Sequence, residues 1–405
     1  MSTTKNTKKV QSTLEKLQPS LHPVKEHPLS NCEEFVQKLY ITQLCVMAEY
    51  ENEDVENSLK FVQRIMAGAK MKENITEYRK NAMEMKLEQI EEFILQCKEN
   101  KLCDIFIIDS LLLTMGNGKA NQKQVGYLAE MAEALGINKK RMGYLCEIAV
   151  CILEQDSEKY QKVSAKIPHD VRNEIVECVI GYLKEFVVGV LVDTDEMFYV
   201  YAPEKTEITM KEVFEYHFHN DDKTKWNGSF EVNMKHIVME NLIFSPSEDF
   251  WWYPEFIFKG CSSVVIENCE LGRKGFGFDR VRKVVFSNCF ADGKENNRVD
   301  FWITTYNTKE TEIEIRNCLI CNMQYDDSFI IGGCRYNEKA IVKIKDSEFR
   351  NISTQKGWPI VYNYGLLEVN HSKFENCATK SSKLFWDGID RINREDSEFI
   401  NCSKI

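Results

Sequence analysis

Two neighbouring carboxylates, Asp326 and Asp327, have residue types that suit acid–base catalysis. Hydrolysis by paired carboxylates needs the two groups held at a defined separation, so a dipeptide alone is weak support for it. The flanking Tyr325 and Ser328 make the pair typical of a turn before the apolar stretch 329–333. We therefore predict a turn here and assign no catalytic residue.

Two other groups have side chains that bind metals. Cys318 and Cys321 form a CxxC, which is half of a zinc or redox site, but no matching second pair accompanies it. His217 and His219 would share one face of a strand, close to aspartates 221 and 222. We predict core packing for the cysteines and an ordinary polar surface for the histidines, with no metal and no cofactor.

Aromatic side chains give the clearest indication of binding. They gather in or beside one segment of each repeat described below: Trp251, Trp252, Tyr253, Phe276, Phe278, Trp302, Tyr306, Tyr336, Trp358, Tyr362, Tyr364 and Trp386. Some must be core residues, and the others would form a groove on a side wall. Rings interleaved with Arg and Asp suit recognition of a protein surface or a sugar. The candidate binding residues are Asp279, Arg280, Trp302, Tyr306, Arg335, Tyr364, Trp386 and Asp387.

An eight-residue phrase, repeated seven times between residues 237 and 402, organises these candidates. It is plainest in VVIENCEL (264–271), VVFSNCFA (284–291), IEIRNCLI (313–320), VKIKDSEF (342–349) and LEVNHSKF (367–374). The centres are Asn241, Asn268, Asn288, Asn317, Asp346, His371 and Asp396. Spacings of 20 to 29 residues between centres indicate stacked supersecondary units.

The alternation of apolar residues slips by one position at each centre. Val264 and Ile266 precede Asn268 by four and two residues, whereas Cys269 and Leu271 follow it by one and three. Such a slip turns side chains outward unless the backbone bends, and a left-handed residue makes that bend. Asn, Asp and His tolerate this conformation best after glycine, so we predict it at all seven centres. A second polar residue five positions later, at Asn322, Asn351, Asn376 and Asn401, predicts another turn.

A third strand per repeat fits EFIF (255–258), GFGF (275–278), FWIT (301–304), FIIGG (329–333), PIVYNY (359–364) and LFW (384–386). Three short strands per coil resemble the right-handed parallel β-helix, the pectin lyase-like fold, over residues 231–405. Members that cleave acidic polysaccharides use aspartates on an exposed face, sometimes with calcium and an arginine base, and the related hydrolases share Asn-Thr-Asp, Asp-Asp, His-Gly and Arg-Ile-Lys motifs. Only Asp326-Asp327 is present here. A carbohydrate-active enzyme, a lyase or hydrolase, is thus the alternative that the resemblance implies.

Composition favours a soluble, cytosolic protein. The 405 residues are 43% hydrophobic and 28% charged, and the formal net charge of -11 disfavours general nucleic-acid binding. No apolar signal core begins the chain, and the apolar run 186–192 is too short to span a membrane. The fifteen cysteines are expected to be reduced, because Cys269, Cys289 and Cys318 share their repeat position with serines in later copies.

The region before the repeats has helical periodicity. We predict a flexible leader over 1–29, a capping box at Ser30 and Glu33, and helices that include 55–67, 75–99, 104–115 and 121–135. Val125, Leu128, Met131, Ala132 and Leu135 form the apolar stripe of the last of these, which Gly136 ends.

Residues 106–153, FIIDSLLLTMGNGKANQKQVGYLAEMAEALGINKKRMGYLCEIAVCIL, resemble the TerB-like family of tellurite-resistance and phage or colicin stress loci. The resemblance implies a TerB-like helical domain over 30–155. The family's acidic loop is Gly116-Asn117-Gly118-Lys119 here, and Gln122 and Gln124 replace acidic residues. Calcium prefers carboxylates, so the family's metal site is not expected. Asp109 is expected to be solvated or capping.

A connector and cap is predicted over 156–230, including a helix opened by Pro168. At the other end of the repeats, Arg394 replaces an apolar residue. An open last coil there would be covered by self-association or by a partner strand.

The predicted fold is α+β and multidomain, with an N-terminal all-α TerB-like bundle and a C-terminal right-handed parallel β-helix. We expect a non-catalytic intracellular recognition or assembly protein in a stress or phage-defence setting, with the helical module as an interaction or sensing domain. A protein partner is expected, and no membrane association.

Overall fold

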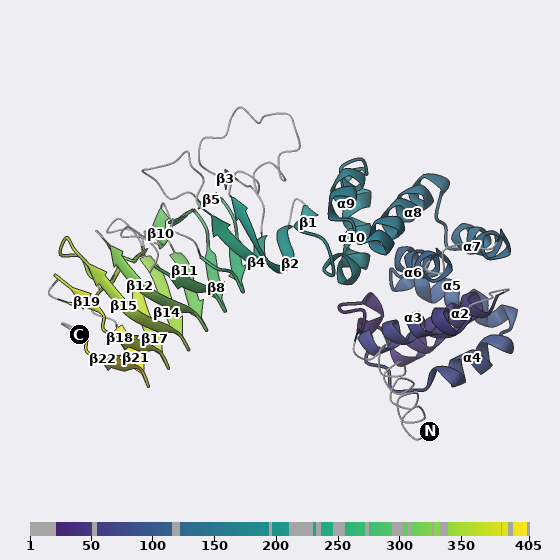
Figure 1. Cartoon of the computed structure of the whole chain (residues 1–405), viewed down its shortest axis with the longest axis horizontal. Helices are drawn as coiled ribbons and strands as arrows, with labels where there is room; N and C mark the ends of the chain where they lie inside the picture. The colour runs from purple at the N-terminus through teal and green to yellow at the C-terminus, as the bar shows by residue number, and fades with distance from the viewer. Residues whose placement is uncertain are drawn as a thin grey trace, which may run out of the picture. The chain divides into compact units, whose positions relative to one another are not determined.

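The structure is a computed structural model that describes residues 22–50, 55–115, 122–193, 197–209, 230–231, 236–245, 256–271, 275–293, 303–306, 310–325, 328–332, 339–381, 383–387 and 392–402. The chain divides into two compact units, Met1–Val187 and Val188–Ile405. The first is helical and the second is built of strands (Figure 1). The α+β class predicted from the sequence is confirmed.

The helical unit has, within its described residues, one 3-10 helix and nine α-helices. They are η1 (Pro28–Asn31), α2 (Glu34–Glu49), α3 (Val55–Gly68), α4 (Ile75–Met83), α5 (Leu87–Glu99), α6 (Cys103–Met115), α7 (Gln122–Ala134), α8 (Lys139–Glu154), α9 (Ser157–Ser164) and α10 (His169–Leu183). In α6 every residue from Asp104 to Thr114 is buried, because α2, α3, α7, α8 and α10 surround it. Such all-round burial explains why α6 is apolar on every face.

Three local predictions for the helices were wrong. The helix predicted over 75–99 is two helices, because α4 ends at Met83 and the side chain of Gln89 caps the backbone N–H of Lys86 at the start of α5. The capping box at Ser30 is absent, since Glu33 precedes α2 and makes no side-chain cap. Val125 is 51% exposed, although the other four residues of its stripe are buried.

The described part of the predicted leader, residues 22–29, packs onto the bundle. Val24, His27 and Leu29 are buried. The backbone N–H of Val24 donates to the carbonyl of Arg64 at 3.1 Å. Gly68 lets this segment approach, because a β-carbon there would lie 1.9 Å from the carbonyl oxygen of Val24.

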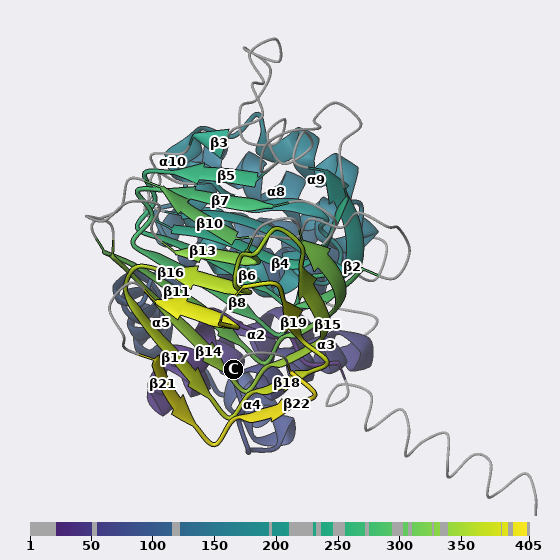
Figure 2. The same cartoon turned by 90° about the vertical axis from the view of Figure 1, so that its left-hand side faces the viewer.

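The second unit is a parallel β-solenoid of three sheets. The nine-stranded sheet orders β1 (Gly189–Asp193), β2 (Met197–Thr209), β4 (His236–Ser245), β6 (Ser263–Glu267), β8 (Lys283–Ser287), β11 (Glu310–Arg316), β14 (Lys339–Lys345), β17 (Leu366–Asn370) and β21 (Ile392–Glu395). The seven-stranded sheet orders β20 (Phe385–Asp387), β16 (Val361–Asn363), β13 (Ile330–Gly332), β10 (Ile303–Tyr306), β7 (Phe276–Asp279), β5 (Phe256–Lys259) and β3 (Phe230–Glu231). Figure 2 shows the order from β16 to β3.

The third sheet orders β22 (Glu398–Ile400), β18 (Lys373–Glu375), β15 (Glu348–Thr354), β12 (Leu319–Tyr325) and β9 (Phe290–Asp292), and β19 (Ala378–Thr379) also pairs with β15. The described pairings are parallel, except that β1 is antiparallel to β2. The predicted connector, 156–230, therefore contributes α9 and α10 to the first unit and β1 and β2 to the second.

The predicted bends are confirmed. All seven phrase centres have positive φ, between 45° at Asp396 and 61° at Asn241. The second polar positions, Asn322, Asn351, Asn376 and Asn401, are left-handed as well. The bend keeps apolar residues on both sides of each centre inside the solenoid, where Val264, Val284, Ile313, Val342 and Leu367 stack in register and are fully buried.

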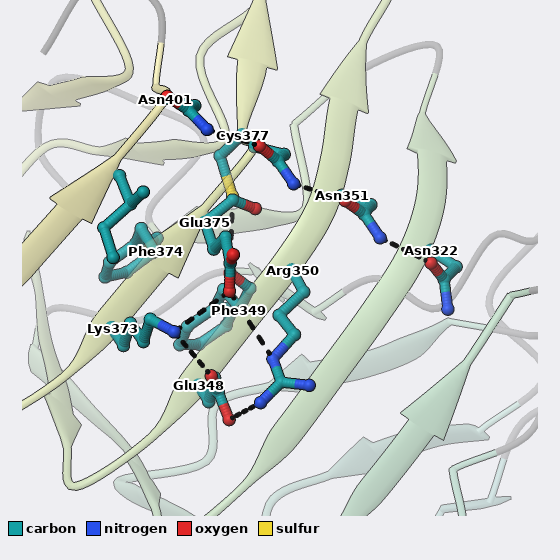
Figure 3. Close-up of polar contacts among 12 residues, drawn as sticks. Asn322, Glu348, Phe349, Arg350, Asn351, Lys373, Phe374, Glu375, Cys377 and Asn401 are labelled. Atoms are coloured by element: carbon teal, nitrogen blue, oxygen red, sulfur yellow. Dashed lines mark hydrogen bonds and ion pairs between the residues drawn. The ribbon is translucent and has the colours of Figure 1, made fainter.

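Polar side chains at these turns form a ladder across the coils. The amide nitrogen of Asn351 donates to Asn322 at 2.8 Å, that of Asn376 to Asn351 at 3.1 Å, and that of Asn401 to Asn376 at 3.2 Å (Figure 3). Beside this ladder, Glu348 and Glu375 accept from Arg350 and Lys373. Each amide thus fixes the register of its own coil against the preceding one.

Candidate binding surface

The third strand of each coil positions the aromatic candidates. The stretches predicted for it overlap β5, β7, β10 and β20 and contain β13 and β16. Within β16, Val361 and Asn363 are buried, whereas Tyr362 between them is half-buried and points outward. In-register pairing then places Tyr362 beside Trp386 of β20 and beside Ile331 of β13. The outer face of this sheet therefore carries an apolar and aromatic row.

Four rings gather on that face, and we call them the β16–β20 cluster: Trp358, Tyr362, Tyr364 and Trp386. Tyr362 stacks on Trp386, with centroids 4.2 Å apart and an interplanar angle of 17°. Tyr364 stands edge-on to both of these rings, and Trp358 stands edge-on to Tyr362. The hydroxyl of Tyr362 donates to that of Tyr364 at 2.8 Å.

The backbone around the cluster is held by the core of the coil. Gly357, with a φ of 85°, turns the chain into Trp358. The hydroxyl of Thr379, in the next coil, donates to the carbonyl of Trp358 at 2.6 Å. At the other end of β16, the buried Asn363 amide donates to the carbonyls of Ala340 and Leu366, at 3.1 and 3.0 Å. The rings therefore stand on a backbone fixed from both sides.

The cluster has the composition of a recognition surface. Trp358 is 40% exposed, and the other three rings are half-buried. Tyr and Trp combine a large apolar face with a hydrogen-bonding group, and they dominate the energetics of binding sites. Rings already packed against one another lose little side-chain entropy when a ligand binds.

The candidate residues of the sequence analysis fall into three groups. Tyr364 and Trp386 belong to the cluster. Asp279 and Arg280 lie at the end of β7, where the guanidinium of Arg280, 65% exposed, is 3.6 Å from the carboxylate of Asp279. The third group is not placed by the structure. Trp302 and Arg335 lie outside the described residues. Tyr306 and Asp387 belong to β10 and β20, but the structure does not describe their side chains.

Trp358 and Tyr362 belong to the cluster but were not among the candidate binding residues. Their aromatic character was visible in the sequence. Tyr362 meets Trp386 only through the pairing of β16 with β20, and Trp358 joins the cluster through its contact with Tyr362.

The candidates for catalysis or metal binding gain no support. Asp326, Asp327, His217 and His219 lie outside the described residues, as does the loop 116–121. Among the residues that the structure does describe, no group of three or more His, Cys, Asp or Glu side chains suits a metal.

The cysteines of the repeat pack in the core, as predicted. Cys318 and Cys321 are buried, and their thiols donate to the backbone carbonyls of Phe286 and Ala291. Burial raises the pKa of the Cys269 thiol to about 12, so this thiol stays protonated at neutral pH.

A buried polar cluster in the helical unit was missed by sequence reasoning. Asp109 of α6 was expected to be solvated or capping, but it is fully buried. Its Oδ1 accepts from the hydroxyl of Tyr182 at 2.6 Å. Its Oδ2 accepts from the hydroxyl of Tyr40 at 2.7 Å and faces Nε2 of His27 at 3.0 Å.

The backbone around His27 fixes its tautomer. The N–H of Leu29 donates to Nδ1 of His27 at 3.2 Å, so Nε2 carries the proton that His27 donates to Asp109. Burial, and then the charge of Asp109, raise the pKa of Tyr40 and of Tyr182 well above the usual range of a phenol. Asp109 thus ties α6 to α2, α10 and the segment before η1.

Comparisons of the chain with protein-family models, curated proteins and solved structures found no match. Within the described residues, no helix is both long enough and apolar enough to cross a membrane.

Proposed function

We propose that the protein is a non-catalytic recognition or assembly protein whose β-solenoid presents the β16–β20 cluster to a protein partner. The observation that carries this proposal is the outward-facing group of four packed rings on a sheet whose backbone is fixed by the core. A rigid aromatic patch is the arrangement expected of a binding hot spot.

The helical unit would act as an interaction or sensing module of TerB-like type. The sequence resemblance over 106–153 supports this role, and so does the helical fold of the unit. The setting in stress response or phage defence rests on the resemblance alone. A pectin lyase-like, right-handed coil and a cytoplasmic location belong to the same proposal, and the fourteen described cysteines, all free thiols, support a reducing compartment.

Affinity purification from the native organism, followed by mass spectrometry, tests the role of the cluster. The wild-type chain is compared with Trp386→Ala and Tyr362→Ala, which remove the two stacked rings. Phe35→Ala is the matched control, because Phe35 is an aromatic residue of the helical unit and is 56% exposed. Far-UV circular dichroism shows whether each variant is folded.

A partner recovered with the wild type and with Phe35→Ala, but lost with both cluster variants, supports the proposal. Retention of every partner by Trp386→Ala and Tyr362→Ala contradicts it.

The alternative is a carbohydrate-active enzyme, because exposed aromatic rings also stack on sugars. Purified protein is incubated with acidic polysaccharides and calcium, and chain length is measured. Cleavage that is lost in Trp386→Ala would favour this alternative over the first proposal.

A further inference from the structure

The coil formed by β20, β21 and β22 ends all three sheets among the described residues. Each of the three strands pairs with one neighbour only, respectively β16, β17 and β18. Edge strands of this kind offer free backbone N–H and C=O groups to any further strand, including one from a second copy of the chain.

The side-chain ladders of the solenoid also reach this edge. Phe349, Phe374 and Phe399 stack in successive coils, with centroids 4.7 and 5.2 Å apart and nearly parallel rings. The N–H of Ser372 donates to Oγ of Ser397 at 3.1 Å, which repeats the bond between Ser347 and Ser372 one coil earlier. The edge coil therefore has the backbone and side-chain pattern on which a further coil would stack.

One inward position breaks the pattern. Ile315, Ile344 and Val369 occupy it in three successive coils, all fully buried, and Arg394 is their partner in β21. The guanidinium carbon of Arg394 lies 5.5 Å from the ring centroid of Phe385 and 5.3 Å from that of Phe399. At these distances a cation is attracted to the faces of both rings. Arg394 thus covers the end of the core with a charge that remains exposed to solvent.

We propose that Arg394 keeps this end of the solenoid from pairing with a second copy of the chain. A second copy stacked on the edge coil would remove the guanidinium from water and bury it against the apolar end of the core, which is costly. In a symmetric end-to-end pair, the two Arg394 side chains would face each other in the joined core. An inward-pointing charge on an edge strand is a known means by which proteins block such pairing.

The outward-facing charges of the same coil also oppose pairing with a second copy. Glu395, Asp396 and Glu398 are exposed and acidic, so two such coils brought together repel each other. Self-association was one of the two ways in which an open last coil was expected to be covered, the other being a partner strand. Arg394 disfavours the first of these.

The test compares the full-length wild type with Arg394→Val, which restores the residue type of Val369. Asn393→Val is the matched control, because it adds the same side chain to the same strand at the outward position that pairs with Glu368. Arg394→Lys keeps a charge without the planar guanidinium. Sedimentation velocity over a wide range of protein concentration gives the mass of each protein.

We expect the wild type, Asn393→Val and Arg394→Lys to remain monomers, and the mass of Arg394→Val to double or to rise further with concentration. Hydrogen exchange in the associated form should slow in β20, β21 and β22. If Arg394→Val is insoluble, Arg394→Gln carries the test, since it removes the charge without adding an apolar side chain, and the same association is expected. A folded, monomeric Arg394→Val, or a wild type that associates as strongly, overturns the proposal. The proposal is also overturned if Asn393→Val or Arg394→Lys associates as strongly as Arg394→Val.

Discussion

Replacing Asp109 by Asn should destabilise the helical unit and leave the solenoid unchanged. The carboxylate accepts three hydrogen bonds in a site that excludes water. A bond to a charged acceptor contributes about 1 kcal/mol more than a bond to a neutral one, and a buried donor without an acceptor costs about 1–3 kcal/mol. An asparagine weakens two of the bonds and turns its NH₂ group toward the third donor, so the expected loss is about 3–5 kcal/mol.

The distribution of tryptophan separates the two units in one experiment. All six tryptophans lie between residues 226 and 386, so tryptophan fluorescence reports the solenoid, whereas the helical signal in circular dichroism reports the first unit. In a urea titration, Asp109→Asn should move the circular dichroism transition to lower urea without moving the fluorescence transition.

Two further variants sharpen the interpretation. Tyr182→Phe removes one donor, and its effect should add less than fully to that of Asp109→Asn, because the two side chains share a bond. Glu158→Gln is the control, since Glu158 forms an exposed ion pair with Lys162 and its loss should have no measurable effect. An Asp109→Asn variant within about 1 kcal/mol of the wild type would refute the argument that the three bonds stabilise the bundle.

Three other predictions concern single residues. Because the pKa of Tyr182 is raised, its phenol stays protonated in the folded state, whereas the phenol in the unfolded chain ionises near pH 10. Its contribution to the free energy of unfolding is therefore complete below about pH 10 and decreases as the pH rises above that value. Urea titrations followed by circular dichroism should show a smaller decrease for Tyr182→Phe. Asn351→Ala loses both ladder hydrogen bonds and places alanine in a left-handed conformation, which should lower the free energy of unfolding by about 2–3 kcal/mol. Asn351→Gly should recover about 1 kcal/mol of this, because glycine adopts that conformation without strain. If urea titrations followed by fluorescence show the same loss of stability for both variants, the left-handed backbone does not contribute. Cys318→Ser should lower the free energy of unfolding by less than about 1 kcal/mol, because Ser347 occupies the equivalent position in the next coil. Cys318→Leu should lower it by about 1–3 kcal/mol, because the larger side chain overpacks the core. The same titrations measure both variants, and a Cys318→Leu variant as stable as the wild type would show that the position is not close-packed.

The features set by local sequence were predictable. The slip in alternation at each Asn, Asp or His needs a bend, and no distant residue has to be known to infer it. The same holds for Cys318 in the core, because Ser347 and Ser372 mark that position as small.

The features set by contacts distant in sequence were not. Asp109 lies in an apolar helix, and its partners Tyr40 and Tyr182 are 69 and 73 residues away, so no local pattern shows its burial. The break between α4 and α5 was missed because the apolar period continues through it. Likewise, Tyr362 and Trp386 meet only once β16 and β20 are in register.

Each coil consists of strands that are held in register, beside the left-handed turns, and of connecting segments whose length varies from coil to coil. The Asn351 ladder and the stacked core residues fix the strands, while the distance between successive phrase centres ranges from 20 to 29 residues. The difference in length must be taken up by the connections, since the strands stay in register. The solenoid is therefore a frame in which a connecting segment can be lengthened or exchanged one coil at a time, and new binding surfaces can arise on it without a new fold.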